Sequence, residues 1–163
     1  MRVIFLDFDG VLNSAEWMNS RDDRGGCDLD RAAVARVQAI CDRAGAVIVI
    51  SSSWRCLYEM PVLRDILRAH GLTAEVIGRT PQIKGRTSPL RCLPEAERVQ
   101  RGEEIAAWLR EHTVASFVIL DDDSDMAHLR DRLVQTGFER GLQAEHVEHA
   151  VALLQDNTSG KCS

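Results

Sequence analysis

The sequence predicts an α/β protein whose core is a doubly wound parallel sheet in a three-layer α/β/α, Rossmann-like arrangement. Short apolar runs rich in Val and Ile, such as residues 3–6 and 46–50, have the pattern of strands buried on both faces of a parallel sheet. Segments with the helical spacing of apolar residues separate these runs. Strands that alternate with helices indicate βαβ units and therefore a doubly wound sheet.

The predicted elements follow one another in a regular order. A strand over residues 2–6 is followed by a helix that begins with the capping residues Asp28 and Asp30 and that Gly45 ends. Pro61 predicts an irregularity near the start of the next helix. The remaining expected elements are a strand over 46–50, a helix over 56–70, a strand over 74–78, a helix over 103–111, a strand over 114–120, a short helix over 126–132, a short strand over 133–136 and a helix over 146–155.

A chain of 163 residues is expected to form one domain, here residues 1–155, that buries about 70% of its unfolded surface. Residues 13–28 are polar and contain glycine, so we expect a small flap there. Residues 79–101 hold three of the four prolines and six basic side chains, which predicts a basic loop. Residues 156–163 form a polar tail.

Composition narrows the class of protein further. A net charge of −5 argues against bulk attraction to nucleic acid or to an anionic membrane. The five cysteines form no Cys-x-x-Cys pair, so we expect reduced thiols and neither a zinc site nor a disulfide framework. No signal peptide precedes the first strand, and no apolar run approaches the ~18 residues of a membrane span. We therefore expect a cytoplasmic protein without a membrane partner.

The end of the first strand carries the strongest signal for chemistry. Asp7 and Asp9 are spaced by one residue, so in an extended chain their side chains point the same way and can share one site. Gly10 then allows a sharp turn. Two carboxylates so close repel each other unless a cation or a shared proton relieves them, and a hard cation such as Mg²⁺ is the simplest relief. Ligands of open α/β sheets bind at the carboxyl ends of the strands, which favours a functional site over a solvated strand end.

The run Asp7-Phe8-Asp9-Gly10-Val11 after an apolar strand resembles the first motif of the haloacid dehalogenase-like (HAD) phosphohydrolase superfamily, Asp-x-Asp-x-(Thr/Val). The resemblance implies a HAD-like fold. It also implies phosphoryl transfer through an aspartyl-phosphate on Asp7, with Asp9 as general acid and base. Mg²⁺ is the implied cofactor. Relatives that cleave carbon–halogen bonds generally differ at the second acid, so a phosphatase is favoured over a dehalogenase.

Two further motifs of the superfamily have candidates in this sequence. The hydroxyl motif after the second strand is assigned to Ser52, with Ser51 as the alternative, and Arg55 is a candidate for a phosphate contact. A serine-rich helix cap is the competing interpretation of these serines. The basic motif before the last motif strand is assigned to Arg101, with Lys84 as its competitor. We group Ser51, Arg55, Lys84 and Gly10 as candidates for substrate binding.

The strand over 114–120 runs into an acidic stretch that resembles the fourth motif. Asp121 and Asp122 would complete a metal site with Asp7 and Asp9, and Asp125 remains an additional candidate. A calcium loop is excluded because its sixth position would be Met126 instead of Gly and its twelfth Arg132 instead of Glu. A zinc site at His146 and His149 lacks a third ligand. The tryptophans (Trp17, Trp54 and Trp108) are interpreted as packing residues.

The substrate class follows from the small insertions. With only the segments 13–28 and 79–101 to cover the site, it should be open enough for a phosphate on a macromolecule or chain end. The arrangement is similar to phosphatase domains of nucleic-acid repair enzymes such as polynucleotide kinase-phosphatase. A nucleic-acid end, a phosphoprotein and a small phosphate ester stay open as substrates. The alternative from another class is a phosphate- or nucleic-acid-binding regulatory module without turnover.

Overall fold

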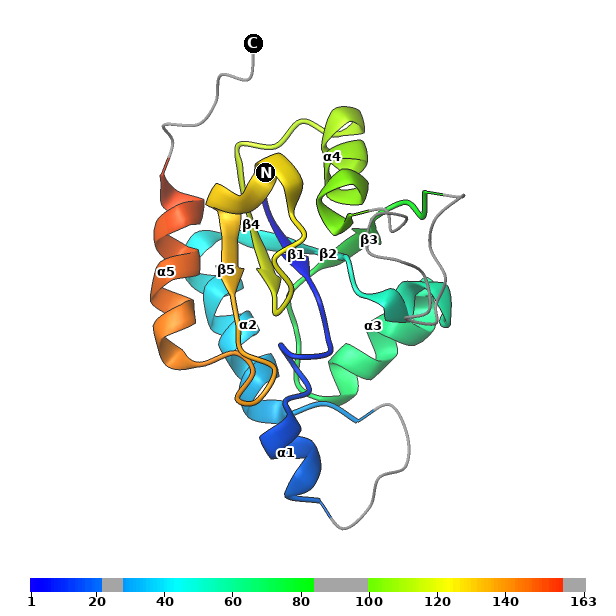
Figure 1. Cartoon of the computed structure of the whole chain (residues 1–163), viewed down its shortest axis with the longest axis vertical. Coiled ribbons are helices and arrows are strands. Elements are labelled where there is room, and N and C mark those ends of the chain that lie inside the picture. The colour runs from blue at the N-terminus through cyan, green and yellow to red at the C-terminus, as the bar shows by residue number, and fades with distance from the viewer. Residues whose placement is uncertain (22–27, 84–99, 157–163) are drawn as a thin grey trace.

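The computed structural model describes residues 1–21, 28–83 and 100–156, and their centre is a parallel sheet (Figure 1). Five strands pair in the order β3-β2-β1-β4-β5, and every pairing is parallel. The order places β1 in the middle of the sheet and reverses direction on either side of it, as a doubly wound sheet requires. The strands are β1 (Arg2–Leu6), β2 (Ala46–Ile50), β3 (Val76–Arg79), β4 (Ser116–Asp121) and β5 (Leu133–Gln135).

Helices cover both faces of the sheet, which gives three layers and confirms the predicted fold class (Figure 1). One face packs against α2, α3 and α5, and the other packs against α4 and η3. The helices are α1 (Ala15–Asn19), α2 (Arg31–Ala44), α3 (Met60–Ala69), α4 (Arg101–Glu111) and α5 (Ala144–Gln155), together with the 3₁₀ segments η1 (Ser53–Cys56) and η3 (Ala127–Arg132).

The alternation of side chains along β1 supplies both cores. Ile4 and Leu6 point into the cluster that contains the apolar faces of α2, α3 and α5. Val3 and Phe5 point the other way, into the cluster formed with α4 and η3. All four are fully buried, and each contributes about 1.5–3 kcal/mol of transfer free energy. Because the central strand is anchored on both faces, the residue that follows it is held at a fixed place.

The termini of α2 agree with the sequence prediction. The side chain of Asp30 accepts a hydrogen bond from the Ala32 amide at 2.8 Å, and Gly45 ends the helix with a φ of 63°. The short helix α1 lies within the segment 13–28, which was expected to form a small flap. Ser14 caps this short helix by accepting a hydrogen bond from the Trp17 amide at 3.1 Å.

The predicted helix over 56–70 is wrong in one respect, since the structure divides the segment. A turn of 3₁₀ helix (η1) ends at Cys56, and α3 begins only at Met60. Pro61 lies in the first turn of α3, where its missing N–H has no helical partner to lose. The proline therefore marks the start of a helix and not an irregularity inside one.

Several expectations fall on residues outside the described ranges. These include Lys84 and most of the basic loop, since residues 84–99 are not described, and the greater part of the polar tail. Among the described cysteines, Cys41 and Cys56 are free thiols. No helix within residues 1–21, 28–83 and 100–156 has both the length and the apolar character that crossing a membrane requires.

Candidate active site

Three strands end side by side at one edge of the sheet. The Asp7 amide donates to the Leu120 carbonyl at 3.0 Å, which continues the ladder between β1 and β4. The Ser51 amide donates to the Leu6 carbonyl at 3.0 Å, which continues the ladder between β1 and β2. The first residues beyond β1 and β2 and the last residue of β4, Asp121, therefore lie next to one another at the carboxyl edge.

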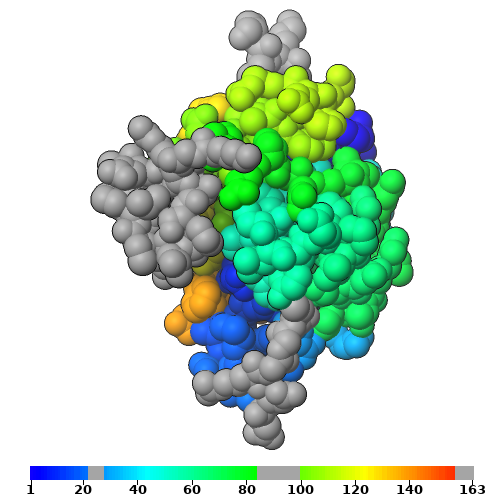
Figure 2. Space-filling model, turned by 90° about the vertical axis from the view of Figure 1, so that its right-hand side faces the viewer, coloured from blue at the N-terminus to red at the C-terminus, as the bar shows by residue number. Residues whose placement is uncertain are grey.

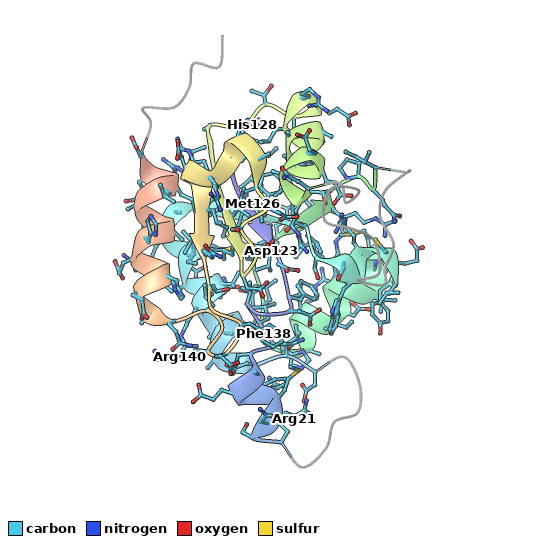
Figure 3. The ribbon with its side chains drawn as sticks, viewed as in Figure 1. Arg21, Asp123, Met126, His128, Phe138 and Arg140 are labelled. Carbon is cyan, nitrogen blue, oxygen red and sulfur yellow. The ribbon has the colours of Figure 1, made fainter. Side chains whose placement is uncertain are left out.

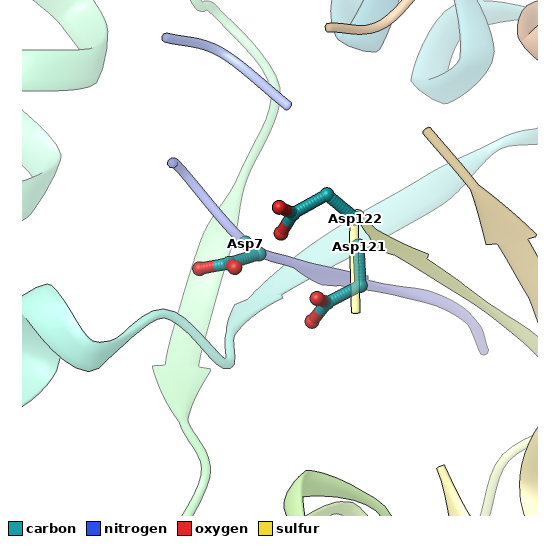
Figure 4. Close-up of side chains that lie close together, drawn as sticks. All are labelled: Asp7, Asp121 and Asp122. Carbon is teal, nitrogen blue, oxygen red and sulfur yellow. The ribbon is translucent and has the colours of Figure 1, made fainter. Parts of the chain in front are cut away.

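Three carboxylates form a cluster at this edge (Figure 4). Asp7, Asp121 and Asp122 each offer an oxygen, and these oxygens all lie within 4.8 Å of one another. Asp7 is 4% exposed and Asp121 is fully buried. The cluster comes from two neighbouring strands that are far apart in the sequence, so the parallel pairing of β1 with β4 creates it.

Asp9 was predicted to share the metal site, and in the structure it lies apart from the three clustered carboxylates. Its carboxylate is not part of the cluster of Asp7, Asp121 and Asp122. The chain leaves β1 at Leu6, so the extended geometry that would have aligned the two acids does not persist to residue 9. Instead, the indole Nε1 of Trp54 donates to Asp9 Oδ2 at 2.9 Å.

Gly10 makes room for the cluster. Its φ of 75° lies in the left-handed region that favours glycine. A Cβ at this position would lie 2.3 Å from Cγ of Asp122, so any side chain there would displace that carboxylate. Thr136 Oγ1 donates to the Gly10 carbonyl at 2.7 Å and fixes the turn. Gly10, predicted to bind substrate, thus has an evident backbone role in placing Asp122.

The guanidinium of Arg101 contacts two members of the cluster. Its Nη1 lies 2.7 Å from Asp7 Oδ2 and 2.9 Å from Asp121 Oδ2. Arg101 is the first residue of α4, and its backbone amide donates to Asp125 Oδ2 at 3.1 Å. Asp125 thus binds the start of α4 and stands outside the three-carboxylate cluster. Of the two candidates for the basic motif, Arg101 is at the cluster, and Lys84 lies outside the described residues.

The next residue, Gly102, explains how α4 can begin so near the acidic loop. Its amide donates to the Asp125 carbonyl at 3.2 Å. A Cβ on Gly102 would lie 2.2 Å from the Met126 carbonyl oxygen, so only glycine permits this approach. The close contact between α4 and the loop after β4 places Arg101 beside the carboxylates.

The charges of the cluster are not balanced within it. Burial raises the pKa of Asp121 well above its ordinary value of 3.8, and the charge of Asp7 adds to this rise. Burial and Asp7 raise the pKa of Asp122 as well. For Arg101, burial disfavours the charged form, but Asp7 and Asp121 outweigh it and raise the pKa of the guanidinium. One cation against three carboxylates leaves an excess of negative charge, and an all-oxygen donor set suits a hard divalent cation.

The two candidate serines lie in different surroundings. Ser52 Oγ accepts a hydrogen bond from the Trp54 amide at 3.3 Å and so caps η1. Ser51 Oγ is buried and has no hydrogen-bond partner among the described residues. A buried hydroxyl without a partner is costly unless something binds it. Ser51 therefore has a hydroxyl without another partner, whereas Ser52, the first choice from the sequence, accepts a hydrogen bond in the cap and keeps its O–H to donate.

Arg55 was predicted to contact phosphate, and the structure gives it a different place. Its Nη2 pairs with Glu104 of α4, and its Nη1 donates to the carbonyl oxygens of Ser51 and, at 2.8 Å, Ser52. The two charged side chains are 6% and 4% exposed. The guanidinium of Arg55 is bound within this buried network and fixes the turn that follows β2.

The sequence analysis did not predict the contacts of two residues near the site. Glu104 adjoins the core residue Ile105 on α4, and nothing in the local pattern marks it as the partner of Arg55. Trp54 was expected only to pack, yet it also donates a hydrogen bond to Asp9. Trp54 comes directly after the serine run in the sequence. This position does not distinguish a packing residue from a hydrogen-bond donor.

Comparison with known families agrees with the fold. Residues 3–147 match the family described as the HAD domain in Swiss Army Knife RNA repair proteins. The chain belongs to this family. The match confirms the resemblance to HAD phosphohydrolases and to nucleic-acid repair enzymes, and it supports a HAD-type phosphatase in general terms. Comparisons with curated proteins and with solved structures gave no match.

Proposed function

We propose that this HAD domain is a Mg²⁺-dependent phosphatase that hydrolyses a phosphomonoester through an aspartyl-phosphate on Asp7. The observation that carries the proposal is the separation of the two acids of the first motif. Asp7 lies within the carboxylate cluster against Arg101, whereas Asp9 is held apart by Trp54. Asp7 therefore lies among the charged groups of the cluster, and Asp9 lies outside them and is available for proton transfer.

In the first half-reaction a carboxylate oxygen of Asp7 attacks phosphorus, and the bond from phosphorus to the leaving oxygen breaks. Asp9 gives its proton to that oxygen. In the second half-reaction Asp9 takes a proton from the attacking water, phosphate leaves and Asp7 is regenerated. Arg101, 2.7 Å from Asp7 Oδ2, orients the nucleophilic carboxylate. The free hydroxyl of Ser51, or that of Ser52, donates to a phosphoryl oxygen.

The residues of the cluster fit a resident cation. Asp7, Asp121 and Asp122 would hold Mg²⁺, because they present clustered oxygens whose charge Arg101 only partly offsets. When bound, Mg²⁺ would neutralise negative charge on the transferring phosphoryl group.

The substrate class we favour is a phosphorylated end of RNA. Its support is the description of the family, which places such domains in RNA repair proteins. A phosphoprotein and a small phosphate ester are the other classes considered. The alternative of a regulatory module that binds phosphate without turnover has no observation in its favour, since the nucleophile, the second acid and the late acidic pair are all present.

The test is phosphate release in the presence of Mg²⁺ or EDTA from three substrates: an aryl phosphate, a 5′-phosphorylated oligoribonucleotide and a 3′-phosphorylated oligoribonucleotide. We expect Mg²⁺-dependent turnover of all three, with a higher kcat/KM for one of the RNA ends. Turnover of the aryl phosphate alone would reject RNA ends as substrates. Binding of the oligonucleotides without any release of phosphate would instead support the regulatory module.

The raised pKa values of Asp121 and Asp122 predict how stability depends on pH and Mg²⁺. A raised carboxyl pKa means that the folded protein binds protons more tightly than the unfolded chain. The stability of the metal-free protein should thus fall as the pH rises from the ordinary value of 3.8 toward the raised pKa values. Mg²⁺ at ten times its Kd should restore about 1.4 kcal/mol at neutral pH, which raises Tm by roughly 3–6 °C.

Thermal unfolding with Mg²⁺ or EDTA, at about pH 5 and about pH 7.5, measures these effects. The informative variant is Asp122→Asn, which removes one of the repelling charges. Without metal at the higher pH it should unfold at a higher temperature than the wild type, and it should lose most of the gain from Mg²⁺. An equal Mg²⁺ gain in wild type and variant would contradict Asp122 as a ligand.

A further inference from the structure

We propose that Trp54 is a positioning residue for Asp9, whose indole N–H holds one carboxylate oxygen so that the other faces the leaving group. The inference rests on the proposed phosphatase function and adds a residue to it. Trp54 was interpreted from the sequence as a packing residue, and its partly buried ring does pack against the core. Its polar edge, however, is directed to the acid that the proposed mechanism uses for both proton transfers.

The contact is well suited to select between the two oxygens of Asp9. Nε1 of Trp54 lies 2.9 Å from Asp9 Oδ2, across 45 residues of sequence. An indole N–H only donates, so Oδ2 must act as an acceptor in this contact. The contact favours Oδ1 as the oxygen that exchanges a proton, because protonation of Oδ2 would weaken its hydrogen bond with the indole N–H. The donor thus decides which oxygen exchanges the proton.

The amide of Asn13 lies beside the second carboxylate oxygen, Asp9 Oδ1. Its nitrogen is best satisfied by donating to the carbonyl oxygens of Leu12 and Asp28 at 3.1 and 3.0 Å. The amide oxygen then lies on the side of Asp9 Oδ1. In that orientation the Asn13 nitrogen no longer donates to Asp9, which leaves the hydrogen bond from Trp54 as the contact that fixes the carboxylate.

Trp54 is held rigidly enough to act as a fixed donor. Its ring packs edge-on against Phe8, with centroids 5.3 Å apart, and lies tilted against Tyr58 at 5.8 Å. Its backbone belongs to η1, whose start is capped by Ser52 and bound by Arg55. Figure 2 shows the face of the molecule that α3 and α4 form above α1. A donor fixed by packing and by the backbone holds its acceptor without a new loss of side-chain entropy.

Trp54 and the groups of the carboxylate cluster compete as partners for the carboxylate of Asp9. A carboxylate two residues after Asp7 could turn toward Arg101 or toward a cation bound at the cluster, and it would then no longer serve as an acid. The hydrogen bond to Trp54 opposes this, because a charge-assisted hydrogen bond is stronger than one between neutral groups. Removing the indole N–H should therefore impair proton transfer without removing either acid.

The test compares two substrates that differ in their need for a proton. The phenolate of p-nitrophenyl phosphate leaves without protonation, whereas the alkoxide of ethyl phosphate requires it. Trp54→Phe keeps an aromatic ring between Phe8 and Tyr58 and deletes the N–H. We expect kcat/KM for ethyl phosphate to fall about tenfold more than kcat/KM for p-nitrophenyl phosphate. Trp108→Phe is the matched control, and it should leave the ratio of the two values unchanged.

The outcomes separate this inference from the proposed function. An active wild type in which Trp54→Phe lowers both values by the same factor would overturn the role of Trp54 and leave the phosphatase intact. A wild type without turnover on either substrate would overturn both. A larger loss on ethyl phosphate in Trp54→Phe, with the ratio unchanged in Trp108→Phe, supports the inference.

A measurement on the wild-type fold covers the case in which Trp54→Phe does not fold. The chain has three tryptophans, so Trp17→Phe and Trp108→Phe identify the indole N–H proton resonance of Trp54 by elimination. This resonance should shift upfield in Asp9→Leu, because the acceptor is removed. A resonance that does not respond to Asp9→Leu would show that the hydrogen bond is absent and overturn the inference.

Discussion

Replacing Asp7 by Asn is expected to abolish phosphate release, with kcat lowered by at least about 10⁴-fold. The substitution keeps the shape of the side chain and its contact with the Phe8 amide, which donates to Asp7 Oδ1 at 2.8 Å. It removes the charge that makes the group a nucleophile and an Arg101 partner. An amide cannot form the covalent intermediate, so the effect should fall on kcat and not only on KM.

The same acidic neighbourhood offers a matched control for this substitution. Asp123 follows the cluster in sequence but is exposed, and its Oδ1 accepts a hydrogen bond from the Ser124 amide at 2.7 Å. Figure 3 labels it beside the loop that runs to Met126. Asp123→Asn should change turnover by less than about threefold, because a solvated charge outside the cluster is largely screened. Turnover that persists in Asp7→Asn would refute Asp7 as nucleophile.

Replacing Arg55 by Met is expected to cost about 3–5 kcal/mol of folding free energy, which lowers Tm by roughly 10 °C. The change leaves the carboxylate of Glu104 buried, 4% exposed and without its partner. It also removes the donor to the Ser51 and Ser52 carbonyl oxygens. A buried charge without a partner is among the most costly defects that a single substitution can create. Thermal and denaturant unfolding measure the loss.

Two further variants separate burial from charge pairing as the cause. Arg43 and Glu148 form an exposed pair, 45% and 70% exposed, with two hydrogen bonds of 2.6 and 2.8 Å. Arg43→Met should change the free energy of unfolding far less than Arg55→Met does, because solvent screens an exposed ion pair. The combined replacement of Arg55 and Glu104 by Met should recover part of the loss, since no charge is then left buried. Equal losses for Arg43→Met and Arg55→Met would contradict the explanation.

Much of the fold could be predicted because its signals are local. The apolar runs of β1 and β2, the periodicity of α2 and the capping residue Asp30 are patterns of neighbouring residues, and the structure has these elements where they were expected. Element boundaries were less accurate. Pro61 lies in the first turn of α3, at a point where the sequence suggested that a helix had already begun.

The candidate site was predicted unevenly for a comparable reason. Asp7, Asp121 and Asp122 could be proposed as neighbours because each comes at the end of an apolar run, and parallel strands present these ends at one edge. The choice between Arg101 and Lys84 had no such basis. The contact of Arg101 with the cluster depends on Gly102 packing against the Met126 carbonyl, which no local pattern records. The loop after β5, where Figure 3 labels Phe138 and Arg140, likewise meets α1 only in three dimensions.

The sequence by itself determined the order of strands and helices, the parallel doubly wound sheet and the acidic residues at the strand ends. Only the tertiary structure decided which partners those acids contact. Asp9 meets Trp54 across 45 residues, and Arg55 meets Glu104 across 49. Such pairs form where the sheet order and the packing of α4 bring distant segments together, and the energy of each contact depends on burial. Burial is a property of the folded chain, so these contacts follow from the tertiary structure.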